Sequence, residues 1–260
     1  FNSDWVYVDD DFTSDLGFIP RTSIFKSGTS ASRNFYPNNK NINSYSFSLL
    51  NLMWFQKNLD YKKTDHFFSF EYELEFKKQS KLGIEFKKQF VYLSSPFDPS
   101  RSDNGKPLPG QTGYDFGNWS ISYQSPLANT FNFTSTFSYG TFFNGTRFSY
   151  QGTTQYRFQP KVILSLLWDY NKIILPNPYP TTNLLLISPK IQVTLNRNLF
   201  WSTLIQYSNQ IDDFGINSRL QWRFAPLSDL YLVYNDSYDA EQFSPVFRSI
   251  NLKLTYWINL

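Results

Sequence analysis

The chain has 260 residues, of which 41% are hydrophobic, 20% aromatic and 17% charged, and its formal net charge is +3. It has no cysteine and one histidine, which excludes disulfides, cysteine-ligated metal centres and sites built from several histidines. No basic tract accompanies the small positive charge, so a surface for nucleic acid is not expected. The many rings of Phe, Tyr and Trp require an extensive apolar environment.

No segment predicts a transmembrane helix. The most apolar stretches, 162–168 and 184–187, are far shorter than the roughly 20 residues that such a helix needs. The N-terminus lacks the basic and apolar regions of a signal peptide and reads as interior sequence, so we expect further sequence upstream. The mean hydropathy of −0.42 suits a soluble protein and equally a membrane barrel, whose spanning strands are half polar.

Alternation of apolar and polar residues with period two dominates the chain and predicts β-strands. Glu71, Glu73 and Glu75, for example, alternate with apolar residues, whereas a helix would scatter them over several faces. The final segment alternates in the same way, so we expect the last strand to run to Leu260. The predicted strands are 5–8, 21–35, 42–57, 66–78, 81–93, 118–126, 130–141, 146–158, 160–171, 186–196, 199–209, 216–225, 228–236 and 247–259.

This pattern predicts an all-β fold, an antiparallel transmembrane β-barrel of about fourteen strands, within twelve to sixteen, because bacterial single-chain barrels close with an even number. Short and long joints alternate along the chain, and the joint at Asn144-Gly145, on the long side, is itself a short hairpin turn. Short periplasmic turns and longer surface loops are typical of outer-membrane barrels. The short joints lie near 79–80, 126–129, 159–160, 196–198 and 225–228, and the longer ones near 58–65, 95–117, 171–183, 209–215 and 236–245.

A soluble β-sandwich would also alternate, with its apolar residues turned inward. Three features favour the barrel: the aromatic excess, the rings near strand ends and a chain that ends within a strand. No linker, composition break or internal repeat marks a second domain, so residues 1–260 are expected to form a single outer-membrane barrel domain. The rings near predicted strand ends are Tyr45, Phe76, Trp119, Tyr139, Tyr156, Trp168, Trp201, Trp222 and Tyr256.

Two parts of the sequence resemble a family of large outer-membrane proteins of the Bacteroidota. One is Asp15-Leu16-Gly17-Phe18-Ile19-Pro20-Arg21, and the other is the closing run Leu220-Gln221-Trp222-Arg223-Phe224, Asp229-Leu230-Tyr231-Leu232-Val233-Tyr234-Asn235 and Leu252-Lys253-Leu254-Thr255-Tyr256-Trp257. That family joins an N-terminal carbohydrate-binding module of the family-nine type to a C-terminal barrel, so the resemblance implies that this chain is the barrel. The resemblance carries no glycan-binding role to any residue here, and Leu260 departs from the usual terminal aromatic residue.

In each predicted strand the polar residues that alternate with apolar ones face the inside of the barrel, and many of them are charged. Early strands contribute mainly carboxylates and later strands mainly bases, so we expect one acidic arc and a largely basic remainder. Two interpretations remain open: a transverse field that orients polar or zwitterionic solutes in an aqueous passage, or ion pairs that fill a closed interior. The predicted lumen-lining residues are Glu71, Glu73, Glu75, Arg147, Arg157, Asp169, Arg219, Arg223 and Lys253.

Few residues could carry catalytic or metal chemistry. His66 shares the parity of Phe68, which places it on the lipid-facing side near the rim. Ser69 has the opposite parity, so the two side chains are not expected to form a catalytic Ser–His pair. The acidic run Asp9-Asp10-Asp11 with Asp15 could ligate a hard cation, but its spacing matches no loop motif and a solvated surface loop is the simpler interpretation. We therefore expect no catalytic residue, no metal and no cofactor, and a protein that is not an enzyme.

The loop 95–117 is the longest predicted joint and is rich in Pro and Gly. It could fold into the mouth of the barrel as a constriction or dock a partner. Tyr114, Phe116 and Trp119 at its end could stack on sugar rings or serve as interfacial girdle residues.

We expect an integral protein of the bacterial outer membrane that transports or handles polar solutes or surface glycans. The alternative is a plugged structural or assembly subunit of an outer-membrane complex. The expected partners are outer-membrane lipids and lipopolysaccharide, together with other outer-membrane or surface proteins.

Overall fold

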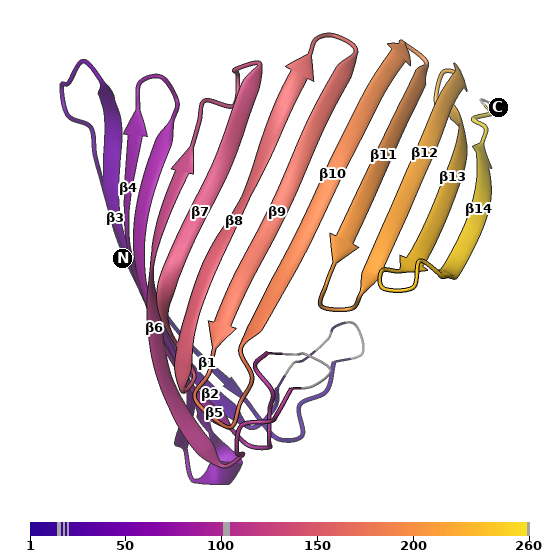
Figure 1. Ribbon diagram of the computed structural model, residues 1–260. Helices are drawn as coiled ribbons and strands as arrows, with labels where there is room; N and C mark the ends of the chain where they lie inside the picture. The colour runs from indigo at the N-terminus through magenta and orange to yellow at the C-terminus, as the bar shows by residue number, and fades with distance from the viewer. Residues whose placement is uncertain (15–16, 18, 20, 101–104, 259–260) are drawn as a thin grey trace. The chain divides into compact units, whose positions relative to one another are not determined.

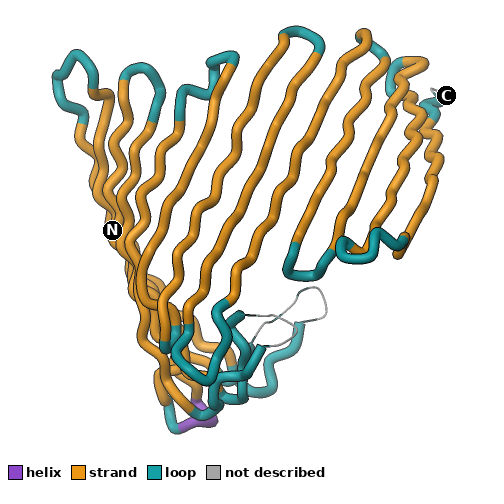
Figure 2. The backbone as a smooth tube through the Cα atoms, in the orientation of Figure 1, coloured by secondary structure: helices purple, strands orange, loops and turns teal. Residues whose placement is uncertain are grey.

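The chain is an all-β protein. The computed structural model describes residues 1–14, 17, 19, 21–100 and 105–258. Strands account for most of the described chain, as Figure 2 shows, and the described helical structure is the 3₁₀ turn η1 (Lys57–Leu59). The strands are β1 (Asn2–Val8), β2 (Ile24–Phe35), β3 (Ile42–Gln56), β4 (Lys62–Phe76), β5 (Lys81–Leu93), β6 (Thr112–Gln124), β7 (Phe131–Phe142), β8 (Gly145–Phe158), β9 (Val162–Ile174), β10 (Thr182–Asn196), β11 (Leu199–Ser208), β12 (Asp213–Ala225), β13 (Ser228–Asp239) and β14 (Pro245–Thr255).

The fourteen strands belong to one sheet in which they follow one another in chain order, β1 to β14 (Figure 1). Each described pairing is antiparallel. This confirms the predicted strand number and is consistent with a β-barrel, since antiparallel neighbours in chain order are the pattern of an up-and-down barrel. By internal contacts the chain divides into two units, which are described separately below: Phe1–Tyr123 with Phe137–Phe148 and Lys172–Thr182, and the remainder.

Several predicted boundaries are wrong. β6 begins at Thr112, so Tyr114 and Phe116 are strand residues rather than loop residues, and the joint before them covers 94–111. β14 ends at Thr255, so the last strand does not continue to the C-terminus as the alternation suggested. Beyond β14, the Trp257 amide donates to the side-chain oxygen Ser228 Oγ (3.0 Å) instead of to a backbone carbonyl of a neighbouring strand. Asp15, Leu16, Phe18 and Pro20 of the family resemblance, Arg101 to Asn104 and Leu260 lie outside the described residues.

The sheet has one apolar and one polar face, because side chains alternate between faces along a strand. In the first unit, Phe70 of β4 lies opposite Leu49 of β3 and Phe86 of β5, whereas Glu71 lies opposite Ser48 and Glu85. In the second unit, Leu230 and Leu232 of β13 pair with Leu254 and Leu252 of β14. The predicted alternation is confirmed by these registers.

Burial in this protein is the reverse of that in a soluble sandwich. Of the residues whose burial is described, the buried hydrophobic ones are Ile24, Leu108, Phe116, Ile173 and Leu175. In contrast, Trp119, Ile121 and Leu252 on the apolar face are 58%, 52% and 69% exposed. A packed interior would remove most of this surface from water, so the apolar face has no protein layer over it within the described chain. No helix among the described residues combines the length and apolar character needed to cross a membrane.

The long joint 94–111 is anchored by aromatic residues. Phe97 and Leu108 form an isolated antiparallel bridge, and Leu108 is completely buried. The Phe97 ring packs 5.9 Å from that of Phe143, and Phe143 stacks on Phe116 at 5.0 Å. In β6 the even residues, such as Ser120 and Ser122, lie on the polar face, and Phe116 shares their parity. Phe97 therefore holds the described part of the joint against the loop end of β6 and β7 on that face.

Candidate binding surface on the polar face

An acidic wall lies on the polar face of β4 and β5. We use this name for Glu71, Glu73, Glu75 and Glu85 with the lysines between them, Lys81 and Lys87. The carboxylates of β4 share a face because they occupy alternate positions along the strand. Across the pair with β5, Glu71 lies opposite Glu85 and Glu75 lies opposite Lys81. Two of the carboxylates are paired with bases: Lys81 Nζ lies 3.0 Å from Glu73 Oε1, and Lys87 Nζ lies 2.8 Å from Glu85 Oε2.

The two remaining carboxylates of the wall are less strongly compensated. Ser44 Oγ donates to Glu75 Oε2 at 3.3 Å. Within the described part of the chain Glu71 has no ion-pair or hydrogen-bond partner, and it lines a hollow together with Ser30, Ser48 and Ser69. A carboxylate among hydroxyl groups can accept hydrogen bonds from a polar solute or attract a cation.

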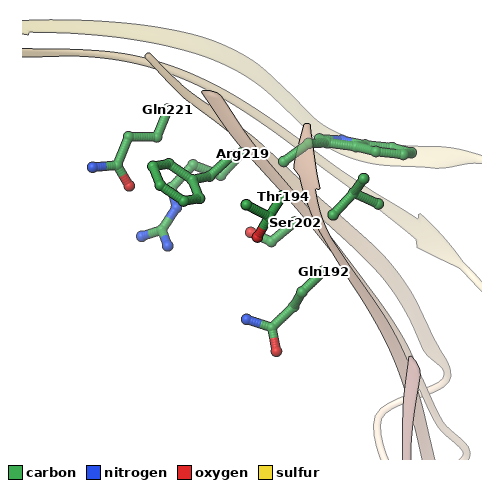
Figure 3. A pocket seen from close by; sticks show the side chains of 8 residues that line it. Gln192, Thr194, Ser202, Arg219 and Gln221 are labelled. Atoms are coloured by element: carbon green, nitrogen blue, oxygen red, sulfur yellow. The ribbon is translucent and has the colours of Figure 1, made fainter. Parts of the chain in front are cut away.

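A second hollow, the arginine pocket, lies on the polar face of β10, β11 and β12. Two cross-strand rows form it: Gln192–Ser202–Arg219 and Thr194–Phe200–Gln221. Figure 3 shows the labelled side chains projecting from the same side of the strands into the hollow. This arrangement follows from the register, because residues that are opposite in an antiparallel pair share a face.

The charge of the arginine pocket is not neutralised by the protein. Arg219 is exposed and has no hydrogen-bond or ion-pair partner in the described residues. Gln221 is held in place, since its Nε2 donates to Asp229 Oδ1 (3.0 Å) and to the Tyr231 hydroxyl (3.1 Å). An unpaired guanidinium beside amides, hydroxyls and the Phe200 ring can bind a carboxylate while a sugar ring packs on the phenyl face.

The other predicted lining residues have diverse contacts. Arg223 Nε lies 3.5 Å from Asp229 Oδ1, and Lys253 lies opposite Tyr231 on the polar face of β13 and β14. Arg157 donates to Gln155 Oε1 (2.8 Å) and to the Leu127 carbonyl (2.9 Å), so it braces a short joint.

Two predicted lining residues contact neighbours near the loop ends of their strands. The Arg147 guanidinium lies 4.4 Å from the ring centroid of Phe142. Asp169 Oδ1 accepts a hydrogen bond from Asn171 Nδ2 at 2.7 Å. Both groups therefore have protein partners, which leaves Glu71, Arg219 and Lys253 as the predicted charges with no hydrogen-bond or ion-pair partner in the described chain.

Sequence reasoning missed two contributors to this surface. Phe200 was hidden within the run Leu199-Phe200-Trp201, in which three apolar residues obscure the alternation. Lys81 begins β5 directly after a turn, where parity is hard to assign. The signal for Lys81 was its position opposite Glu75 in a hairpin with a short turn, since hairpin register follows from turn length.

His66 and the acidic run stand apart from this surface. His66 Nε2 lies 2.8 Å from Asn51 Oδ1, and register places both residues on the apolar face, opposite Met53 and Phe68 respectively. Asp9 and Asp10 share Lys57, whose Nζ lies 3.0 and 3.8 Å from their Oδ1 atoms. Within the described chain no group of three or more His, Asp and Glu side chains is arranged for a metal ion.

No protein-family model matches this sequence, and no curated protein matches it significantly.

Proposed function

We propose that this chain is an integral β-barrel of a bacterial outer membrane that handles polar solutes along its polar face. The observation that carries the proposal is the apolar face, which displays exposed rings and aliphatic side chains on strand after strand. Only lipid or another protein can cover so large an apolar surface. Since hydrocarbon cannot satisfy an open sheet edge, a sheet in this position must close into a barrel.

The polar face supports the choice of polar solutes. In the proposed barrel the acidic wall and the arginine pocket face water, and each offers charge of one sign among neutral hydrogen-bonding groups. Such surfaces orient polar solutes and select among them by charge. The proposal assigns no catalytic residue. Membership of the Bacteroidota barrel family, on the stretches 220–224, 229–235 and 252–257, is part of the same proposal.

A plugged structural subunit is the second candidate. One observation favours it: the joint 94–111 is fixed by the Phe97–Leu108 bridge and by the packing of Phe97 on Phe143. A loop held on the polar face at the loop end of the strands narrows any passage there. The two candidates differ in whether the reconstituted protein conducts ions.

Labelling tests the membrane location and the orientation. The chain has no cysteine, so single cysteines can be introduced at Lys106, in the joint 94–111, and at Leu227, in the turn 226–227. An impermeant maleimide added to intact cells should label the Lys106→Cys variant and spare Leu227→Cys, and both should react after lysis. Labelling of Leu227→Cys alone would invert the orientation, and recovery of the protein in the soluble fraction would refute the membrane location.

Planar bilayers test solute handling. Glucuronate added to the conducting protein should reduce its current more than glucose does, because Arg219 supplies an unpaired guanidinium. The Arg219→Gln variant should lose this difference. Arg197→Gln is the matched control, since Arg197 is exposed in the short joint 197–198. A protein that inserts without conducting would favour the plugged subunit.

A further inference from the structure

A band of apolar residues on the first unit ends at a definite level. In β4 the apolar face reads Phe68, Phe70, Tyr72, Leu74 and Phe76, a stretch of nine residues, which is about the length with which a tilted strand spans hydrocarbon. Neighbouring strands continue its rows: Leu49–Phe70–Phe86 and Phe47–Tyr72–Ile84. The Phe86 ring packs 4.8 Å from that of Trp119 of β6, which extends the row Leu49–Phe70–Phe86 into the next strand.

Polar groups appear at the loop-side edge of this band. The row that contains Phe68 has Asn51 on one side and Lys88 on the other. Gly117 of β6 comes next, since a Cβ built on it would lie 3.4 Å from the Lys88 Cα, and the Gly117 amide donates to Thr141 Oγ1 at 2.8 Å. Lys88 therefore sits at the level where, in a membrane, hydrocarbon gives way to lipid headgroups.

Two further lysines lie nearer the loop end of β4. Lys63 Nζ lies 4.6 Å from the ring centroid of Phe90, and Lys62 Nζ lies 3.8 Å from that of Tyr92. Phe90 is the next apolar-face residue of β5 after Lys88, opposite His66. We call Lys62, Lys63 and Lys88 the lysine patch.

The lysine patch has no anionic partner in the described chain. No carboxylate lies within ion-pair distance of any of its three ammonium groups there, and Lys88 is exposed. Asp115, in the adjacent strand β6, interacts electrostatically with His66 at longer range. It forms no ion pair with a lysine of the patch in the described residues. The patch thus keeps a net positive charge at the edge of an apolar surface.

The apolar face of β13 and β14 shows the opposite solution. Arg248 also lies at the loop end of that face, but Asp236 stands directly opposite it, with Arg248 Nη2 2.9 Å from Asp236 Oδ2. Tyr234 and Tyr238 donate to the same carboxylate oxygen at 2.5 and 2.8 Å. The protein therefore compensates Arg248 with its own carboxylate and leaves the lysine patch without one in the described residues.

We infer that the lysine patch binds the phosphate groups of an outer-leaflet lipid of the lipopolysaccharide type. The acyl chains of that lipid lie against the band below Lys88, and its phosphates supply the anions that the chain does not. The inference rests on the proposed membrane location and adds a specific lipid contact to it. Juxtamembrane lysines attract anionic lipid by about 1 kcal/mol each, so losing two should weaken binding roughly 30-fold at low salt.

The test uses the full chain reconstituted in phosphatidylcholine vesicles. Fluorescent bisphosphorylated lipid A and the same lipid after phosphatase treatment are compared as ligands, with inorganic phosphate as a competitor. The Lys63→Gln/Lys88→Gln double variant removes two charges of the patch. Lys77→Gln/Lys78→Gln is the matched control, because both lysines are exposed in the short joint 77–80 at the other end of the same two strands.

Wild type should prefer the phosphorylated lipid, the patch variant should lose roughly 10- to 30-fold in affinity, and the control should lose little. Equal affinity of wild type for the two lipids, or equal losses in the two double variants, overturns the inference. Displacement by inorganic phosphate as effective as by lipid A shows a free-anion site and overturns the lipid assignment. Failure of wild type to insert, seen as full digestion by external protease, overturns the membrane location as well, whereas insertion without phosphate preference overturns this inference alone.

Discussion

Arg248 and Asp236 face each other across β13 and β14 at the loop end of an otherwise apolar face, 2.9 Å apart between Nη2 and Oδ2. The Asp236 side chain is 2% exposed and that of Arg248 is 55% exposed, so the arginine shields a carboxylate that has little water. The Tyr234 and Tyr238 hydroxyls donate to the same oxygen, Oδ2, whereas the buried Oδ1 has no hydrogen-bond partner in the described residues. Removing one partner of such a pair leaves the other buried charge uncompensated, which costs more than the pair contributes.

Arg248→Gln should therefore lower the thermal unfolding midpoint of the reconstituted protein by several degrees. Arg248→Lys should restore part of the loss, since an ammonium can still reach Asp236 Oδ2 but lacks the second donor with which the guanidinium now contacts it. Unfolding followed by circular dichroism in vesicles measures both. Arg197→Gln, at an exposed residue of the joint 197–198, is the control. A midpoint for Arg248→Gln equal to that of the control would mean that Asp236 is not stabilised by the pair.

Phe137→Arg should destabilise the protein by about 2–4 kcal/mol in a bilayer, because the apolar face of β7 would then carry a charge within hydrocarbon. Thr136→Arg, on the opposite face of the same strand, should cost far less. Urea unfolding of both variants in vesicles gives the comparison. Similar losses in the two variants would show that the assignment of lipid and water to the two faces is wrong.

Glu73→Lys should make the conducting protein more selective for anions. The change removes the acceptor of Lys81 and places a third positive charge in the acidic wall, beside Lys81 and Lys87. Reversal potentials in a salt gradient across a planar bilayer measure the selectivity. Glu241→Lys makes the same change of charge in the exposed joint 240–244 and should have little effect. A reversal potential that ignores the Glu73 change would remove the acidic wall from the lining of the passage.

Asp9 should contribute to acid sensitivity. Hydrogen bonds from the Lys57 ammonium, the Asp10 amide and the Tyr7 hydroxyl lower the pKa of Asp9 below its ordinary value of 3.8, and the pKa of Lys57 is raised by the same contact. A lowered folded pKa means that the stabilisation is present above the unfolded pKa and is lost as the pH falls through the folded one.

Asp9→Asn should therefore lower the thermal midpoint slightly at neutral pH and make no difference at a pH well below the lowered folded pKa of Asp9, where the wild-type carboxyl is protonated as well. The effect should be small, because the Asp9 side chain is 59% exposed and water screens the pair. Asp60→Asn, at an exposed residue of the joint 57–61, provides the control at each pH. A deficit of Asp9→Asn that persists unchanged at acid pH would contradict this account.

Alternation along the sequence was enough to predict most strands, a strand number of about fourteen and the face of residues in regular runs, because a strand alternates its side chains with period two whatever surrounds it. Glu71, Glu73 and Glu75 share a face for that reason alone, and β5 was predicted at 81–93, as observed. Strand ends were less secure: Tyr114 and Phe116 were assigned to a loop, because Gly113 and Gly117 around them resemble turn residues.

Which charges are compensated depends on the pairing of strands, which the pattern along one strand does not reveal. Parity placed Arg219 and Arg223 on one face, but the register of β12 with β13 sets Asp229 opposite Arg223 and leaves Arg219 opposite Val233. In the same way Arg248 meets Asp236, whereas Lys88 meets Phe68. Partners across a sheet are distant in sequence, and a bulge such as that between Ser237 and Tyr238 moves the register by one residue, so ion pairing follows from strand pairing and not from the pattern of a single strand.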